Sequence, residues 1–248
     1  MANNIKIKIC GQNNPAIINH CLDLNISYQG LIFYEKSPRF IDIETLALVN
    51  QYFKTHKDKF VGVFVNPSIG EIKNKLEVFD FDTIQLHGNE DQNFISEVKS
   101  NFKKKIYKSI SPEDFKTTEL IDVDQFLIEA KPSSNQMPGG NNTTWIYKSI
   151  SPEDFKTTEL IDVDQFLIEA KPSSNQMPGG NNTTWDWSDF KNIKNLPYIL
   201  SGGLNVTNIK KAISLTGADF VDINSGVEEQ PGEKSLTLID GIISSIYN

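Results

Sequence analysis

Residues 106–145 and 146–185 are one stretch of 40 residues, repeated without a single difference. An old duplication accumulates substitutions, so complete identity indicates either a very recent event or an engineered one. The repeat constrains the fold because a fold that needs this segment once must also place its second copy. Removing one copy of 40 residues from the 248 leaves 208, the length of one α/β-barrel domain or of two small domains.

Short apolar runs alternate along the chain with longer segments of helical periodicity. The runs are nearly continuous stretches of β-branched and aromatic residues, as in parallel strands that are covered on both faces. Expected strands span residues 5–10, 30–35, 60–65, 83–87, 105–110, 125–130, 197–202 and 220–225. Expected helices span residues 14–24, 42–55, 69–78, 91–102, 112–121, 187–193, 206–215 and 235–246. Several helices begin at capping residues, such as Asp42, Ser111, Asp186 and Asn205.

Without the surplus copy, this pattern makes eight strand–helix units in one domain over residues 1–248. Eight such units predict a compact (β/α)8 barrel, the TIM barrel. A doubly wound open sheet is the alternative, but its first strand is often followed by a GxGxxG turn. Here the first strand is followed by CGQNNP at residues 10–15, which favours the barrel.

The repeat covers part of the expected fifth strand, the fifth helix, the sixth strand and the following loop. An eight-stranded barrel uses each of these once, so we expect one copy, 106–145 or 146–185, to lie outside the barrel. The stretch 131–145 that ends the first copy is rich in Pro, Gly, Ser and Asn, which is typical of a loop. We expect the working sixth strand to come from the second copy, because that copy continues directly into Asp186 and the next helix.

The net charge is −8 and the isoelectric point is about 5.0, which argues against a nucleic-acid binder or a protein bound to anionic membranes. No apolar run approaches 18 residues, and the first residues lack a secretory signal pattern. We therefore expect a cytoplasmic protein, a monomer or homodimer, whose partner is a small molecule. The two cysteines form no disulfide framework, and no spacing of His, Asp or Glu suggests a metal site.

Polar residues at strand ends are the candidates for chemistry, since barrel enzymes act at the carboxyl ends of their strands. Cys10 ends the first strand, and a thiol near a cation can ionise and serve as a base. A small buried core residue is the alternative there, and it is the interpretation we favour for Cys21. Arg39 could bind a carboxylate through two parallel hydrogen bonds or be solvated. His87 could polarise a substrate or satisfy a neighbouring backbone group.

Glycine pairs follow the last two expected strands. Ser201-Gly202-Gly203 and Asn224-Ser225-Gly226 stand where barrels commonly hold phosphate, because bare backbone N–H groups of adjacent loops can surround a dianion. Tight turns are the other use of such glycines. Two such loops on consecutive strands favour a phosphate site.

Taken together, these motifs resemble those of the phosphoribosylanthranilate isomerase family. The resemblance rests on IKIKICG (5–11), SPR (37–39), QLHG (85–88), LSGGLNVTNI (200–209) and VDINSGVEEQPGEKS (221–235). It implies an Amadori rearrangement in tryptophan biosynthesis, from N-(5′-phosphoribosyl)anthranilate to 1-(2-carboxyphenylamino)-1-deoxyribulose 5-phosphate. It implies no cofactor and no metal.

The resemblance also implies roles for individual residues. Cys10 would be the general base, Arg39 would bind the anthranilate carboxylate, and His87 and Asp222 would line the substrate site. The phosphate would be held by Gly202, Gly203, Ser225 and Gly226.

Two positions depart from the family's pattern. The family's general acid is an aspartate at the end of the sixth strand, but here the segment is FLIEA, so the acid would be Glu169 or its duplicate Glu129. The extra methylene could lower the rate by about ten- to a hundredfold, because proton transfer depends on close positioning. The following loop is GGNN (139–142 and 179–182) where the family has GGTG.

Two other functions remain open from the sequence. One is a catalytically impaired barrel that only binds a phosphorylated ligand. The other is another phosphate-binding barrel enzyme, such as a sugar-phosphate epimerase, which would need a metal or a different pair of carboxylates.

Overall fold

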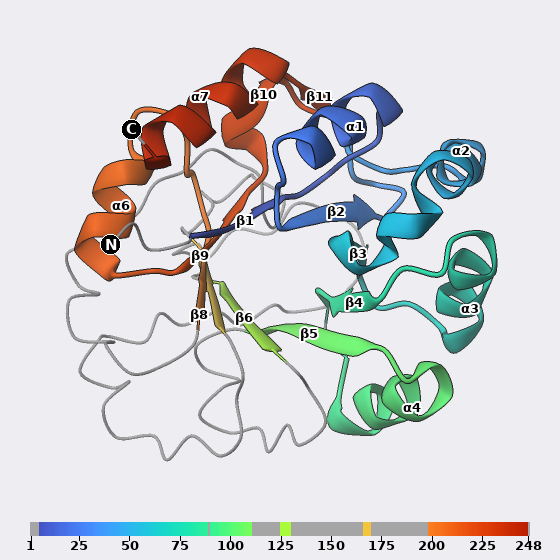
Figure 1. Ribbon diagram of the computed structural model, residues 1–248. Helices are drawn as coiled ribbons and strands as arrows, with labels where there is room; N and C mark the ends of the chain where they lie inside the picture. The colour runs from blue at the N-terminus through green and yellow to red at the C-terminus, as the bar shows by residue number, and fades with distance from the viewer. Residues whose placement is uncertain (1–4, 89, 111–124, 130–165, 170–197, 248) are drawn as a thin grey trace, which may run out of the picture.

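Nine parallel strands form one closed ring within the residues that the structure describes, and the helices lie around its outside (Figure 1). The structure is a computed structural model, and it describes residues 5–88, 90–110, 125–129, 166–169 and 198–247. The predicted α/β barrel of parallel strands is confirmed. Strands follow one another around the ring in chain order, and the last pairs with the first.

The ring consists of β1 (Lys6–Ile9), β2 (Tyr28–Ile32), β3 (Phe60–Phe64), β4 (Thr83–Leu86), β5 (Lys105–Ile110), β6 (Gln125–Glu129), β7 (Phe166–Glu169), β8 (Tyr198–Leu200) and β9 (Phe220–Ile223). The helices are α1 (Pro15–Asp23), α2 (Ile43–Phe53), η1 (Lys54–Lys59), α3 (Ile69–Val78), α4 (Gln92–Phe102), α6 (Ile209–Thr216), η4 (Ser225–Val227) and α7 (Leu236–Tyr247). A small antiparallel pair, β10 (Glu228–Gln230) and β11 (Glu233–Lys234), follows η4.

The expected helices that fall on described residues are confirmed to within a few residues at their ends. Asp42 caps α2 as predicted, since its carboxylate accepts a hydrogen bond from the Thr45 backbone N–H at 2.6 Å. The expected helices at 112–121 and 187–193 lie outside the described residues. In the described part of the chain, no helix has the length and apolar character needed to cross a membrane.

The expected number of eight strands is wrong, because the same strand from both copies of the repeat belongs to the ring. β6 and β7 pair in parallel with Ile128 opposite Ile168 and Glu129 opposite Glu169. An unpaired copy would leave a row of backbone N–H and C=O groups without partners, whereas pairing inside the ring satisfies them. The expectation that one copy lies entirely outside the barrel therefore fails for this strand. The rest of the two copies after residue 110 lies outside the described residues.

Side chains alternate between the two faces of each strand. Ile7 and Ile9 on β1 belong to the large core between the ring and the helices. Cys10, two positions after Lys8, packs instead with Val61 and Tyr107 in a smaller cluster. Because successive strand residues point to opposite faces, Lys8 and Cys10 face the interior of the ring.

A buried ion pair links β5 to the loops that follow β3 and β4. The Lys108 ammonium lies 2.7 Å from a Glu90 carboxylate oxygen, and their side chains are 4% and 2% exposed. Glu90 also accepts hydrogen bonds from the backbone N–H groups of Asn66 at 2.7 Å and Gly88 at 3.0 Å. The Lys108 ammonium donates to the Gly88 carbonyl at 2.6 Å. These contacts hold the loop after β4 against the ends of two neighbouring strands.

We predict that Glu90→Gln lowers the free energy of unfolding by about 3–5 kcal/mol, because Lys108 would remain buried without a counter-charge. Urea unfolding followed by circular dichroism measures the change. Glu77→Gln is the matched control, since the Lys73–Glu77 pair is 3.8 Å long and more than half exposed on both sides. That control should cost less than about 1 kcal/mol. Equal losses in the two variants would contradict a specific role for the buried pair.

Candidate active site

Cys10 follows β1 at the carboxyl end of the ring and is 5% exposed. Gly30 on β2 makes the space for its thiol, because a Cβ at position 30 would lie 2.7 Å from the Cys10 Sγ. Val61, Val63 and Tyr107 complete the apolar surroundings. The thiol is thus held at the mouth of the barrel, facing inward.

Lys8 and Asp222 form an ion pair directly beside this thiol. They are register partners on β1 and β9, and the Lys8 Nζ lies 2.9 Å from the Asp222 Oδ2. Their side chains are 1% and 7% exposed. Lys8 was missed by the sequence analysis. The alternation of Lys6 and Lys8 with Ile7 and Ile9 could have identified it, because a lysine inside a parallel barrel needs a charged partner.

The pKa of the Cys10 thiol is raised above its ordinary value, chiefly because burial disfavours the thiolate. The positive charge of Lys8 opposes this rise, and the negative charge of Asp222 adds to it. Burial also acts to lower the pKa of Lys8, but Asp222 and Cys10 outweigh that effect and the pKa is raised. Lys8 therefore stays charged, and Cys10 rests as a thiol whose ionisation depends on its two charged neighbours.

A second buried cluster joins Arg39, Glu228 and Lys234. The Arg39 guanidinium donates from Nε at 2.8 Å and from Nη2 at 2.7 Å to the two carboxylate oxygens of Glu228. The Lys234 ammonium donates to the same carboxylate and to the side-chain oxygen of Asn224 at 2.9 Å. Arg39 is only 7% exposed, so it is not a solvated surface arginine. One carboxylate between two cations leaves a net positive charge.

The pKa values of this cluster follow from its burial and its charges. Burial acts to raise the pKa of Glu228, but hydrogen bonds from Arg39 and the charge of Lys234 outweigh it, so the pKa is lowered. Burial lowers the pKa of Lys234 to about 8 although Glu228 opposes the change. Neither Glu228 nor Lys234 was predicted as a site residue, although both lie in the motif at 221–235.

Gly11 brings the thiol and the arginine cluster together. Its φ is +75°, which glycine adopts readily. A Cβ at this position would lie 2.8 Å from the Arg39 Cδ and 2.9 Å from the Asn224 Oδ1. The chain that leaves Cys10 therefore passes directly against the side chain of Arg39.

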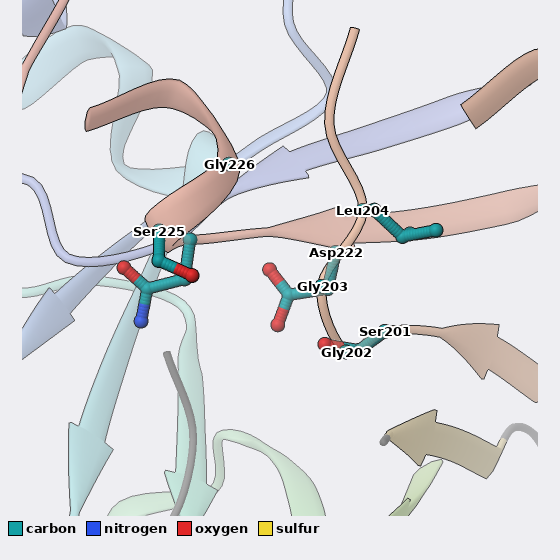
Figure 2. A pocket seen from close by; sticks show the side chains of 8 residues that line it. Ser201, Gly202, Gly203, Leu204, Asp222, Ser225 and Gly226 are labelled. Atoms are coloured by element: carbon teal, nitrogen blue, oxygen red, sulfur yellow. The ribbon is translucent and has the colours of Figure 1, made fainter. Parts of the chain in front are cut away.

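The glycine loops after β8 and β9 enclose a hollow beside Asp222 (Figure 2). Its lining consists of Ser201, Gly202, Gly203, Leu204, Asp222, Asn224, Ser225 and Gly226. Gly202 and Gly203 have φ values of +94° and +63°. A Cβ at Gly226 would lie 1.7 Å from the Leu204 carbonyl oxygen, so the two loops are in close contact. The close approach of these two loops was predicted from the sequence.

Backbone N–H groups in such loops can hold a phosphate. The carboxylate of Asp222 would repel an anion, but Lys8 already neutralises it through Oδ2. Its other oxygen, Oδ1, is buried and has no hydrogen-bond partner among the described residues. That oxygen could accept a hydrogen bond from a ligand hydroxyl.

Comparison with known proteins identifies the family. The model of the N-(5′-phosphoribosyl)anthranilate (PRA) isomerase family matches residues 7–145 and 141–245. An N-(5′-phosphoribosyl)anthranilate isomerase of Rhizobium etli is 31% identical over 247 residues, which cover 97% of this chain and 93% of that protein. This chain belongs to the N-(5′-phosphoribosyl)anthranilate isomerase family. The two family matches overlap at residues 141–145, where the first copy of the repeat ends.

Solved isomerase structures share the fold. Phosphoribosyl anthranilate isomerase from Thermotoga maritima has a TM-score of 0.68 at 22% identity and covers 98% of both chains. A phosphoribosyl anthranilate isomerase in complex with reduced 1-(o-carboxyphenylamino)-1-deoxyribulose 5-phosphate has a TM-score of 0.65 at 22% identity, with 98% of both chains covered.

His87, part of the family's QLHG motif, follows β4 at the same end of the ring as Cys10. Its backbone N–H donates to the Phe64 carbonyl at 2.8 Å, and its Nδ1 lies 3.1 Å from the Gln85 Nε2. These contacts fix the ring and select the orientation of the imidazole. Its predicted contact with substrate stays a prediction.

The expected general acids end β6 and β7. Their Cα atoms are partners in the strand register, Glu129 opposite Glu169, so both backbones reach the rim together. The side chains of both residues, and the GGNN loops at 139–142 and 179–182, lie outside the described residues. The choice between the two copies therefore stays a prediction.

We predict that Gly226→Ala weakens binding of inorganic phosphate at least about tenfold, because the added methyl group cannot fit against the Leu204 carbonyl without separating the two loops. Isothermal titration calorimetry measures this affinity. Gly217→Ala is the control for a left-handed glycine distant from the site. It has φ of +74° and an open surrounding, so it should cost stability but leave phosphate affinity unchanged. Unchanged phosphate affinity in Gly226→Ala would show that the hollow between the two loops does not bind phosphate.

Proposed function

We propose that this chain converts N-(5′-phosphoribosyl)anthranilate to 1-(2-carboxyphenylamino)-1-deoxyribulose 5-phosphate, the Amadori rearrangement of tryptophan biosynthesis. Membership of the isomerase family supports the reaction. The observation that carries the proposal is that Gly11, next to Cys10, lies against both Arg39 and Asn224, which lines the hollow between the glycine loops. The substrate has a carboxylate at one end and a phosphate at the other, which matches these two anion sites.

The hollow between the loops after β8 and β9 would hold the phosphate. Gly202, Gly203, Ser225 and Gly226 line it and would offer backbone N–H groups. Asp222 lies at its inner side, where its Oδ1 would accept a hydrogen bond from a ribose hydroxyl. The ribose would thereby extend from the hollow toward Cys10.

Arg39 would bind the anthranilate carboxylate. Its Nε and Nη2 donate to Glu228, and the substrate carboxylate would lie beside the guanidinium that these bonds hold. Glu228 holds the guanidinium plane in a fixed orientation, and Lys234 adds a second positive charge nearby. Fixed donors of this kind bind a carboxylate with a defined geometry.

The reaction requires one acid and one base. The acid, Glu169 or its duplicate Glu129, would give a proton to the ring oxygen of the ribose as the C1′–O bond breaks and the iminium forms. The Cys10 thiolate would then take the proton from C2′, and the bonding electrons would form the enamine that tautomerises to the ketone. These steps move protons and electron pairs within the substrate, so they consume no cofactor.

A catalytically impaired barrel that only binds the phosphorylated ligand is the second candidate. The replacement of the family's aspartate by glutamate favours it, because the longer side chain changes the position of the acid. Turnover separates the two candidates: an impaired barrel would bind product with normal affinity but would not consume substrate.

We predict that Cys10→Ala lowers kcat by at least about a thousandfold, since no other base would reach C2′. The decrease in anthranilate-substrate fluorescence measures turnover, and circular dichroism verifies folding. Cys21→Ser is the control, because Cys21 lies in the core between the ring and the helices and accepts a hydrogen bond from Gln12 at 3.3 Å. It should retain most of the activity. Turnover by Cys10→Ala near the level of the unmodified chain would exclude Cys10 as the base.

We predict that Glu169→Gln removes at least 99% of kcat, whereas Glu129→Gln retains most of it, because the second copy continues directly into the rest of the barrel. Glu169→Asp restores the family's acid and should raise kcat up to about tenfold by shortening the side chain. The same fluorescence assay measures all three variants. Full activity in both glutamine variants would exclude the two glutamates as the acid.

A further inference from the structure

We infer that Lys8 is a positioning residue for the thiol: its buried ammonium is the counter-ion of the Cys10 thiolate, and Asp222 holds that ammonium in place. This inference rests on the proposed function, in which Cys10 acts as the base. Lys8 has no role in the proposed acid–base steps, and this inference gives it one.

The geometry of β1 brings the two side chains together. Lys8 and Cys10 stand two positions apart on one strand and face the interior of the ring. The Lys8 side chain is 1% exposed, so water screens its charge very little. The charge of this ammonium acts to lower the pKa of the Cys10 thiol, against the effect of burial.

The Asp222 carboxylate holds the Lys8 ammonium inside the ring. An ammonium has three donors, and one of them is directed to the Asp222 Oδ2 at 2.9 Å. A buried ion pair contributes little to stability compared with apolar side chains of the same size. A lysine that neutralises a thiolate explains why a charge is kept inside the barrel.

Among the described residues, few other ionisable groups act on the thiol. Asp222 on β9 and Lys234 on β11 act on it by charge, with opposite signs. Tyr107 on β5 and Tyr28 on β2 belong to the apolar cluster that surrounds it. The charge of Lys8 acts to lower the pKa of Cys10, and the charge of Asp222 acts to raise it. Removing Lys8 should therefore raise the thiol pKa, and removing Asp222 should lower it.

The experiment titrates Cys10 directly, in a Cys21→Ser background so that one thiol remains. Thiolate absorbance at 240 nm against pH gives its pKa, and the iodoacetamide reaction rate at pH 8 gives its reactivity. We expect Lys8→Met to raise the pKa of Cys10 by at least about one unit and to slow alkylation at least about tenfold. Lys8→Arg keeps the charge and should shift the pKa by less than half as much. Asp222→Asn should lower the pKa and accelerate alkylation.

An unchanged thiol pKa in Lys8→Met, or shifts of the same sign in Lys8→Met and Asp222→Asn, would overturn the inference. Lys8→Met leaves Asp222 buried without its counter-charge, so that variant could unfold. The double variant Lys8→Met/Asp222→Asn removes both charges and covers this case. Its thiol pKa should lie above that of Asp222→Asn alone, and an equal or lower value would also overturn the inference.

Turnover distinguishes this inference from the proposed function. If Cys10 is the base, the pH at which kcat/KM rises should move upward in Lys8→Met by the same amount as the thiol pKa. If Cys10→Ala keeps its activity while Lys8→Met still raises the pKa of Cys10, Cys10 is not the base, but Lys8 is still the counter-ion of its thiolate. If Cys10→Ala is inactive and Lys8→Met leaves the thiol unchanged, the inference about Lys8 fails and the proposed function stands.

Discussion

The pairing of the last strand with the first is the constraint on which the described site depends. β9 and β1 meet in register from Lys6 opposite Phe220 to Ile9 opposite Ile223, with Lys8 opposite Asp222. This closure places the loop after β9 beside Gly11, and so brings the hollow between the glycine loops close to the thiol. Without it, the residues that would hold the two ends of a substrate would lie on opposite edges of an open sheet.

The ring accommodates the repeated strand on the side away from this closure. β6 and β7 lie between β5 and β8, whereas the thiol, the arginine cluster and the hollow come from β8, β9, β1, β2 and the segment after β9. A ring widens as strands are added, and its register can stagger to accept one more. The duplicated strand therefore leaves the register of β9 against β1 intact. It places two glutamates, Glu129 and Glu169, opposite each other on adjacent strands.

Buried charges at the mouth of the barrel occur with partners from other strands or loops. Lys8 pairs with Asp222, Arg39 and Lys234 share Glu228, and Lys108 pairs with Glu90. A charge removed from water requires such a partner. The pairs also fix side chains in single orientations, which is what an acid–base reaction needs from its surroundings.

Local sequence by itself determined the order of strands and helices, the thiol at the end of the first strand, and the glycines that turn after the last two. These depend on side-chain periodicity and backbone freedom over a few residues, which a sequence displays directly. Only the tertiary structure showed the partners of the buried charges, because Lys8 and Asp222 are 214 positions apart and Arg39 and Glu228 are 189 apart. It also decided that the ring has nine described strands. Two identical segments have identical local preferences, so local sequence does not determine whether one or both join the ring.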